Sequence, residues 1–272
     1  MGEMETRLPA GMTDEDKDFA RFVEQVRRLT SIDLSQYKET QMRRRLTTLR
    51  LKHGYATFAD FFRAIEKDPI LRGEFLDRMT INVSEFWRNP IRWETLRERF
   101  LPGLLQKSVR LRAWSAACST GEEPYTLAMI LDDMGVLGRA SILATDIDEV
   151  VLAKAREGVY PERSVRDVPP HFIEAYFTRE GEGYRVSDRL KRAVRFERHN
   201  LLLDPFGEGF DLIICRNVLI YFTEEAKHEL YGKLARALRP GGVLFVGSTE
   251  QIFYPDRYGL EPSETFFYRR KV

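Results

Sequence analysis

The sequence predicts an α/β protein in two parts: an all-helical N-terminal domain, then a doubly wound domain with a small β insertion. The first observation is that residues 14–80 carry apolar residues at helical spacing and show no strand pattern. The second is that, after about residue 110, short runs rich in Val, Ile, Leu and Phe alternate with helical patterns. This alternation is typical of βαβ units and of a parallel sheet covered on both faces.

Four successive helical patterns fill the N-terminal part. They are DKDFARFVEQVRRLTSI, SQYKETQMRRRLTTLRLKHG, TFADFFRAIEK and ILRGEFLDRM. In the second pattern, Met42, Leu46 and Leu49 form one apolar stripe, and Gly54 ends the helix.

The C-terminal part is expected to contain five principal strands. They are LRAWSAA, SILATD, VRFER, FDLIICR and GVLFVGS. The final run, SETFFYRRK, predicts an antiparallel strand at an edge of the sheet. We expect a flexible N-terminus over 1–13, a helical domain over 14–80, a linker over 81–110, and the α/β domain over 111–272 with a β insertion over 176–196.

Composition narrows the function classes. The 272 residues carry a net charge of +1, so no global field attracts nucleic acid or an anionic membrane. No apolar run is long enough to cross a bilayer, and two cysteines are too few for a disulfide framework, which favours a cytoplasmic protein. The four histidines are scattered and no C-x-x-C or H-E-x-x-H pattern occurs, so we expect no metal.

A strand–turn–helix, WSAACSTGEEPYTLAMIL, places Glu122 and Glu123 at the start of a helix. Phosphate-binding turns instead carry G-K-[ST] or G-x-G-x-x-G, and these acids would repel phosphate. They favour a positively charged ligand such as S-adenosylmethionine, which is cationic at its sulfonium and amino groups. The alternative is that they only complement the helix dipole, for about 0.3–1 kcal/mol each.

A second acid follows the next predicted strand, in LATDID. Asp146 lies near the position at which doubly wound folds place a carboxylate for the ribose hydroxyls. Asp148 is expected to cap the following helix, which leaves Asp146 free for a ligand. These features predict a nucleoside site, but they do not separate S-adenosylmethionine from NAD.

The longer motifs resemble one family. WSAACSTGEEPYTLAMIL, ATDID, HNLL, FDLIICRNVLIYF and GGVLFVGSTE, with INVSEFWRN before them, resemble the chemotaxis receptor methyltransferases of the CheR family. The resemblance implies an S-adenosylmethionine-dependent methyltransferase domain behind a helical domain. It also implies transfer of a methyl group to glutamate side chains of chemoreceptor cytoplasmic domains, giving glutamate methyl esters in chemotactic adaptation and S-adenosylhomocysteine as product.

The resemblance also implies roles for individual residues. The linker 81–110 would contact the cofactor, and cofactor contacts fall on Asn82, Ser84, Arg88, Glu123, Asp146, Asn200, Leu201, Arg216 and Asn217. Ser84 stands where the family more often has Thr, which keeps the hydroxyl. Arg88 is the expected catalytic residue that positions the substrate carboxylate, and Tyr221 is expected near the transferred methyl. The alternatives are an ion pair of Arg88 with Glu85 or Glu94 and simple core packing of Tyr221.

The proposed chemistry needs no general base. A glutamate side chain has a reference pKa of about 4.3 and is ionised at neutral pH. The protein then has to orient the carboxylate and the sulfonium, and orientation can lower a barrier by several kcal/mol. This agrees with a sequence from which no Ser–His–Asp or Cys–His arrangement can be assembled.

A basic face on the second predicted helix suggests where the receptor docks. It would consist of Arg43, Arg44, Arg45, Arg50 and Lys52, standing out beside the apolar stripe. The expected partner is the glutamate-rich methylation helices of chemoreceptors, and the alternative is a solvated charged face. The patch lacks interleaved aromatic residues, which disfavours nucleic acid. The β insertion looks too short to bind a receptor tail, and we expect a monomer.

Three other functions remain open at this point. The chain could be a methyltransferase of another substrate, or a non-catalytic module that senses the cofactor and binds a receptor. An NAD enzyme is disfavoured because the glycine fingerprint is missing.

Overall fold

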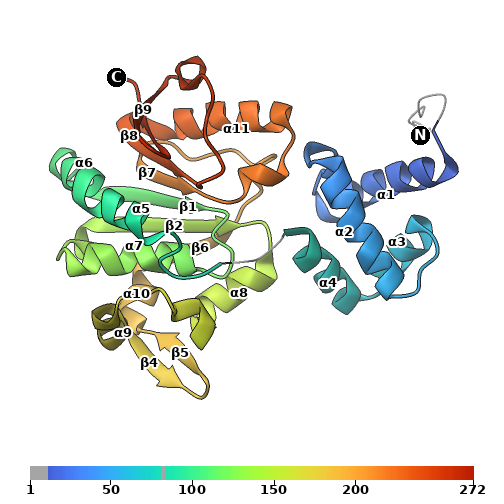
Figure 1. Cartoon of the computed structure of the whole chain (residues 1–272), viewed down its shortest axis with the longest axis horizontal. Coiled ribbons are helices and arrows are strands. Elements are labelled where there is room, and N and C mark those ends of the chain that lie inside the picture. Colours follow the sequence, from blue (N-terminus) through green and yellow to red (C-terminus); the bar gives the residue numbers. More distant parts are fainter. Residues whose placement is uncertain (1–11, 81–83) are drawn as a thin grey trace. The chain divides into compact units, whose positions relative to one another are not determined.

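The computed structural model describes residues 12–80 and 84–272, and the chain forms two compact units (Figure 1). The first unit takes Met1–Ile81 together with Tyr221–Thr223. The second takes Asn82–Ile220 and Glu224–Val272.

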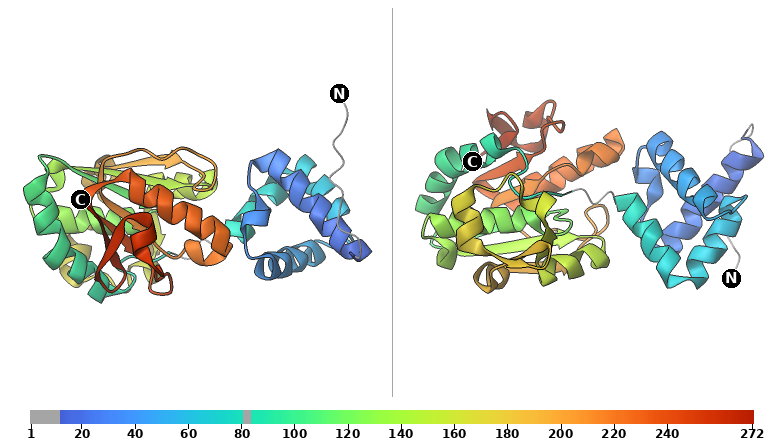
Figure 2. Two further views of the ribbon diagram at one scale, coloured as in Figure 1. Left: turned by 90° about the horizontal axis from the view of Figure 1, so that it is seen from above. Right: turned by 60° about the horizontal axis from the view of Figure 1, so that its bottom comes forward.

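The first unit is a bundle of four α-helices (Figure 2). They are α1 Asp14–Thr30, α2 Glu39–Lys52, α3 Phe58–Lys67 and α4 Pro69–Thr80. Thr13 and Asp16 form a capping box at the start of α1, which satisfies backbone N–H groups that the helix itself cannot pair. The core is aromatic: the ring of Phe22 lies 5.0 Å from Phe58 and 6.0 Å from Phe75. The prediction of an all-helical domain is confirmed.

A short segment from late in the chain completes this unit. Tyr37, which follows the 3-10 turn Leu34–Gln36, forms an isolated β-bridge with Phe222, and their rings lie 5.0 Å apart. The Lys38 N–H donates to the carbonyl of Tyr221 at 2.9 Å. Residues 221–223 are therefore held by the helical unit, although the sequence places them beside the fourth strand of the other unit.

The second unit contains a seven-stranded sheet in the order β6-β2-β1-β7-β8-β10-β9. The strands are β1 Leu111–Ala116, β2 Ala140–Asp146, β6 Val194–Arg198, β7 Phe210–Cys215, β8 Leu238–Val246, β9 Leu260–Glu264 and β10 Phe267–Arg270. The first five are parallel, and β10 pairs antiparallel with both β8 and β9. The doubly wound fold and its five parallel strands are confirmed.

Two details of the sheet differ from the prediction. The strand in SETFFYRRK is antiparallel as expected, but it is not at an edge, because β9 pairs with its outer side. The strand predicted in GVLFVGS begins earlier in the structure, because the preceding residues Leu238–Gly242 already belong to β8 and α11 ends at Ala237.

Helices cover the sheet and connect its parallel strands (Figure 1). The main ones are α5 Pro90–Thr95, α6 Leu101–Lys107, α7 Glu122–Asp133, α8 Glu149–Glu157 and α11 Glu224–Ala237, and a π-helical turn over Leu96–Phe100 joins α5 to α6. The core between helices and sheet is close-packed: the ring of Phe100 stacks 4.5 Å from Phe267, and Trp93 meets Phe245 at 5.7 Å. Burying each such side chain contributes about 1.5–3 kcal/mol.

The β insertion is larger than the sequence suggested. A three-stranded antiparallel sheet joins β3 Val159–Pro161, β5 Gly183–Val186 and β4 Phe177–Glu180. Two short helices, α9 Pro170–Tyr176 and α10 Asp188–Ala193, flank the hairpin. The predicted hairpin exists, but its third strand comes from residues ahead of position 176.

Parallel pairing brings four strand ends to the same edge of the large sheet. Ala116 lies opposite both Thr145 and Cys215, and Cys215 lies opposite Val246. The segments that follow these residues are therefore neighbours, as expected for a ligand site in a doubly wound fold.

Candidate functional site

The turn after β1 has a geometry that demands small residues. Ala117, Ser119 and Gly121 all have positive φ, at 62°, 49° and 94°. A Cβ on Gly121 would lie 2.9 Å from the Cβ of Ala155 on α8, so only glycine fits there. The turn is anchored by the Cys118 N–H, which donates to the carbonyl of Thr145 at 2.8 Å.

Glu122 and Glu123 begin α7, as predicted, but their environments differ. Glu122 is 2% exposed and accepts hydrogen bonds from the hydroxyls of Thr120, at 2.7 Å, and Ser84. The Glu122 carboxylate therefore connects the segment that begins at Ser84 to the turn after β1. Burial raises the pKa of Glu122 above its usual range.

Glu123 reaches across to the neighbouring strands. Its Oε1 accepts from the Ser115 hydroxyl at 2.8 Å, and its Oε2 lies 3.6 Å from Nη1 of Arg216. Burial raises the pKa of Glu123, while the positive charge of Arg216 opposes that shift. The Glu123 side chain is 14% exposed, and a partly buried carboxylate with one long ion pair and one hydroxyl donor keeps acceptor capacity for a cationic ligand.

Arg216 is itself almost fully enclosed. Its Nη2 donates to the carbonyl of Arg88 and to Oδ1 of Asn89, both at 2.9 Å. Its guanidinium lies 4.6 Å from the centre of the Phe245 ring. Burial lowers the pKa of Arg216, and Glu123 is the carboxylate that opposes this effect most. Arg216 thus orients Glu123 and fixes the backbone at position 88.

Arg88 lies in an unusual stretch of backbone. The residues on either side of it, Trp87 and Asn89, have positive φ of 58° and 64°, a conformation that costs free energy in non-glycine residues. The positive charge of Arg88 opposes, as the smallest contribution, the rise that burial causes in the pKa of Glu123. The alternative partner Glu85 instead lies 3.8 Å from Arg166.

Asp146 ends β2 and is 7% exposed. Its Oδ2 accepts from the Ser119 N–H at 2.8 Å, and its Oδ1 accepts from the Asp148 N–H at 3.1 Å. The backbone N–H of Ile147 also acts on this carboxylate, and the acceptor capacity that remains suits a ligand hydroxyl. Burial raises the pKa of Asp146 to about 6. Asp148 caps α8 through the Val150 N–H at 2.8 Å, as predicted.

Asn200 and Leu201 follow β6 and lie close to Asp146. The preceding residue, His199, donates its N–H to the carbonyl of Asp146 at 2.9 Å. Asn200 is 6% exposed, and its Oδ1 accepts from the Leu202 N–H at 3.0 Å. Asn200 therefore stabilises the turn that follows β6.

The structure also reveals Glu250, to which the sequence assigned no role. Its Oε2 accepts from the Asn217 N–H at 2.6 Å and the Gly247 N–H at 2.8 Å, and its Oε1 accepts from Leu219 at 2.7 Å and Ile220 at 3.3 Å. A Cβ at position 247 would collide with this carboxylate. Glu250 thereby holds the segment after β7, including Asn217 with its φ of 61°. The available signal was an acid just after a strand and a glycine, in GGVLFVGSTE.

Two predicted site residues fall outside the described residues of the sheet unit. Tyr221 lies in the helical unit, where its ring is 5.2 Å from the guanidinium carbon of Arg45. Its predicted place near the transferred methyl therefore stays a prediction. Asn82 lies outside the described residues.

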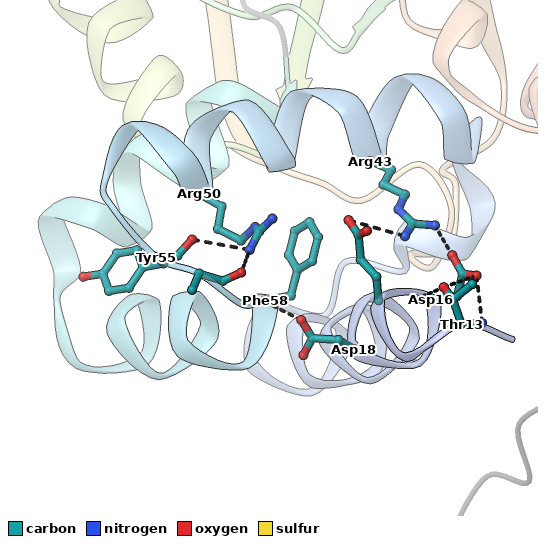
Figure 3. Close-up of polar contacts among 9 residues, drawn as sticks. Thr13, Asp16, Asp18, Arg43, Arg50, Tyr55 and Phe58 are labelled. Atoms are coloured by element: carbon teal, nitrogen blue, oxygen red, sulfur yellow. Dashed lines mark hydrogen bonds and ion pairs between the residues drawn. The ribbon is translucent and has the colours of Figure 1, made fainter.

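The predicted basic face of α2 needs a correction. Arg50 does not stand out: it is 7% exposed, donates to the carbonyls of Tyr55 and Ala56, and lies 4.8 Å from the Phe58 ring centre (Figure 3). The reason is that the loop after α2 folds back and needs a donor for its carbonyl groups.

Of the other basic residues of α2, some form ion pairs and some are exposed to solvent. Arg43 forms an ion pair with Asp16 at 2.6 Å (Figure 3), and Lys52 forms one with Glu74 at 2.6 Å. Arg44 is exposed and lines a shallow hollow of about 470 Å³ on this helix. The exposed basic surface is therefore smaller than the sequence suggested.

The acids of the site fit a cationic nucleoside better than a phosphate. Asp146 is a buried acceptor and Glu123 a partly buried one beside the same turn, and that turn supplies no lysine. Across residues 12–80 and 84–272 no cluster of three or more metal-ligating side chains occurs. No helix within the same ranges is long and apolar enough to cross a membrane.

Comparison with known families and proteins matches nearly the whole chain. Residues 17–80 match the family described as "CheR methyltransferase, all-alpha domain", and residues 82–267 match "CheR methyltransferase, SAM binding domain". A chemotaxis protein methyltransferase of Listeria monocytogenes is 46% identical over 94% of this chain and 98% of its own. Chemotaxis protein methyltransferase 1 of Pseudomonas aeruginosa is 33% identical over 96% of this chain and 100% of its own.

Solved structures match more distantly. CalS10, an amino pentose methyltransferase from Micromonospora echinaspora solved with SAM bound, shares 16% identity with a TM-score of 0.35. The match covers 61% of this chain and 52% of that chain. Such a likeness is too weak to carry an argument about function.

Proposed function

Because the chain belongs to the CheR methyltransferase family, we propose that it transfers a methyl group from S-adenosylmethionine to glutamate side chains of chemoreceptors in chemotactic adaptation. The observation that carries the proposal is a pair of carboxylates beside one small-residue turn, the buried Asp146 and the partly buried Glu123. Two acceptors at this place suit a ligand that offers an ammonium group and ribose hydroxyls.

In this proposal each end of the cofactor meets its own part of the site. Glu123 accepts from the amino group, and Asp146 accepts from the ribose hydroxyls. Asn200 and Leu201 contact the adenine, while Ser84 and Asn217 border the cofactor from the two flanking segments. These assignments rest on the burial, hydrogen bonding and spacing of the residues and on their match to the family motifs.

The bound cofactor supplies a methyl group on a positively charged sulfur. As a carboxylate oxygen bonds to the methyl carbon, the bond from that carbon to sulfur breaks, and neutral S-adenosylhomocysteine is the leaving group. The nucleophile is already ionised at neutral pH, so the site has no proton to remove. The task of the protein is orientation, which can contribute several kcal/mol.

Arg88 is the proposed catalytic residue that orients the substrate carboxylate. Its backbone carbonyl is held by Arg216, and its charge already acts on Glu123. A guanidinium so placed can guide a glutamate side chain into the site. It must not bind the carboxylate more tightly in the ground state than in the transition state, because that would raise the barrier.

Receptor docking is proposed for the part of α2 that stays exposed. Arg44 is exposed and Arg45 half-buried, whereas Arg43 is already paired with Asp16. Desolvation lowers the pKa of Arg45, and the Tyr221 hydroxyl opposes this. A glutamate-rich receptor helix would complement the positive charge of Arg44 and Arg45.

The proposed function is tested by following the methyl group. The protein is incubated with methyl-labelled S-adenosylmethionine and chemoreceptor-containing membranes, and the washed membranes are treated with alkali. Label released as volatile methanol would support carboxyl methylation. Label that resists alkali would favour the alternative of a methyltransferase with another substrate, and cofactor binding without any transfer would favour a non-catalytic sensor.

A further inference from the structure

A second concave surface lies in the sheet unit, away from the candidate site. It is a groove of about 710 Å³ at the start of β2 and β6, beside α10. Four arginines line it, Arg110, Arg189, Arg192 and Arg195, and its lining contains no acidic and no aromatic residue. We call these residues and the space between them the arginine groove.

The groove is separate from the methyl-transfer machinery. Its residues from β2 run from Ala140 to Leu143, at the amino end of that strand, whereas Asp146 stands at the carboxyl end. Parallel pairing of Ile142 with Val194 sets β6 in the same direction. The groove therefore opens at the opposite edge of the sheet from the candidate site. Figure 1 shows α10 at the β2–β6 side of the sheet.

Two arginines of the groove form ion pairs with carboxylates, and all four are exposed. Arg189 forms an ion pair with Asp132 at 2.5 Å, and Arg195 forms one with Glu197 at 2.9 Å. Both guanidinium side chains remain largely accessible, at 67% and 71%. Arg110 and Arg192 are exposed on the same groove. The groove as a whole presents more positive than negative charge to solvent.

The geometry points to an acidic peptide segment of a protein partner as the ligand of the arginine groove. Two of its arginines, Arg189 and Arg195, already pair with carboxylates of the chain, so a carboxylate is a group that these guanidiniums accept. The lining offers Leu137 and Leu143 as apolar contacts but no aromatic ring, which disfavours a nucleotide base because bases bind by stacking. Glutamate or aspartate side chains would bind Arg110 and Arg192, and the apolar contacts would take a side chain between them.

The test uses the full-length protein without cofactor and a fluorescein-labelled oligo-glutamate peptide, followed by fluorescence anisotropy at low ionic strength. We expect binding that weakens as salt is added. The double variant Arg110→Glu/Arg192→Glu should bind about tenfold more weakly. The matched control Arg163→Glu/Arg236→Glu makes the same charge change at exposed positions outside the groove and should stay within about twofold of wild type.

Three results would overturn the inference. The first is no peptide binding by the wild-type protein, and the second is an equal loss in both double variants, which would mean non-specific attraction. The third is binding of inorganic pyrophosphate in place of the peptide, which would identify a phosphate site. S-adenosylmethionine affinity, measured by calorimetry, should be the same in all the proteins. The peptide-binding result therefore tests the arginine groove independently of the proposed methyl transfer.

Discussion

The candidate site at the carboxyl ends of the strands and the basic helix α2 were both predicted from clusters of charged residues. In the structure the charged residues of the two regions are arranged differently. At the strand ends, Asp146 is buried and Glu123 is partly buried, and both lie beside the same turn. On α2, the arginines divide among unrelated tasks: Arg50 is buried, Arg43 is in an ion pair and Arg44 is exposed. The difference teaches that parallel strands bring distant residues together, whereas a helix sends neighbouring residues to different surroundings.

The largest expected effect comes from Glu123→Gln. It removes the charge that faces the cofactor amino group and leaves Arg216 without its carboxylate, so S-adenosylmethionine should bind about 100-fold more weakly. Calorimetric titration measures this. Glu149→Gln, at the start of α8, is the matched control, because it changes a helix-opening acid with no proposed ligand contact. Equal and small effects of the two variants would mean that Glu123 only complements the helix dipole.

Asp146→Asn should weaken cofactor binding roughly tenfold, because one hydroxyl acceptor is lost. The control is Asp148→Asn, since asparagine caps a helix about as well as aspartate. A loss of affinity in the control that matches the loss in Asp146→Asn would assign the effect to the turn rather than to the ligand.

The same residue predicts a pH dependence. Burial raises the pKa of Asp146 to about 6 from 3.8. Between these values the folded state holds more protons than the unfolded state, so this group's contribution to stability falls as pH rises through the window. Cofactor binding should change in the opposite direction, because the hydroxyls donate to the ionised form. Affinity should weaken more steeply as pH falls below about 6 in the wild type than in Asp146→Asn, which keeps only the contribution of Glu123, and parallel curves would contradict this.

Glu250→Gln tests a residue that acts through the backbone. The amide can accept from only some of the four N–H donors, so the segment at Asn217 should loosen, at a cost of about 1–3 kcal/mol in the free energy of unfolding. Cofactor affinity should fall severalfold with it. The exposed Glu261→Gln serves as control. Full stability together with unchanged affinity would remove Glu250 from the account.

The smallest effects on cofactor affinity should come from α2, where stability and methylation rate should separate the arginines. Arg50→Ala should lower the free energy of unfolding by about 1–3 kcal/mol, because the carbonyls of Tyr55 and Ala56 lose their donor. Arg44→Glu should leave stability within about 0.5 kcal/mol and slow receptor methylation severalfold, with cofactor affinity unchanged. Denaturant unfolding and methylation assays measure both. Equal rates for Arg44→Glu and wild type would mean that this face is only solvated.

The sequence could predict features that depend on residues close together in the chain, but not contacts between distant segments. Asp146 and Asp148 were separable because one caps its own helix and the other ends a strand. Glu250 was not predictable, since its four partners are backbone groups that only the folded loops bring together. The burial of Arg50 likewise depends on where the next loop returns. The outer position of β9 and the part of β3 in the small sheet depend on pairings that no local pattern shows.

The central claim is that the methyl group reaches a glutamate carboxylate, and peptide mapping of methylated chemoreceptor by mass spectrometry tests it most directly. Receptor treated with the wild-type protein and S-adenosylmethionine should carry methyl esters on glutamate side chains of its cytoplasmic helices. Arg88→Ala should give the same esters far more slowly while binding the cofactor nearly as well. Methyl groups on other residue types, or none despite cofactor binding, would contradict the account.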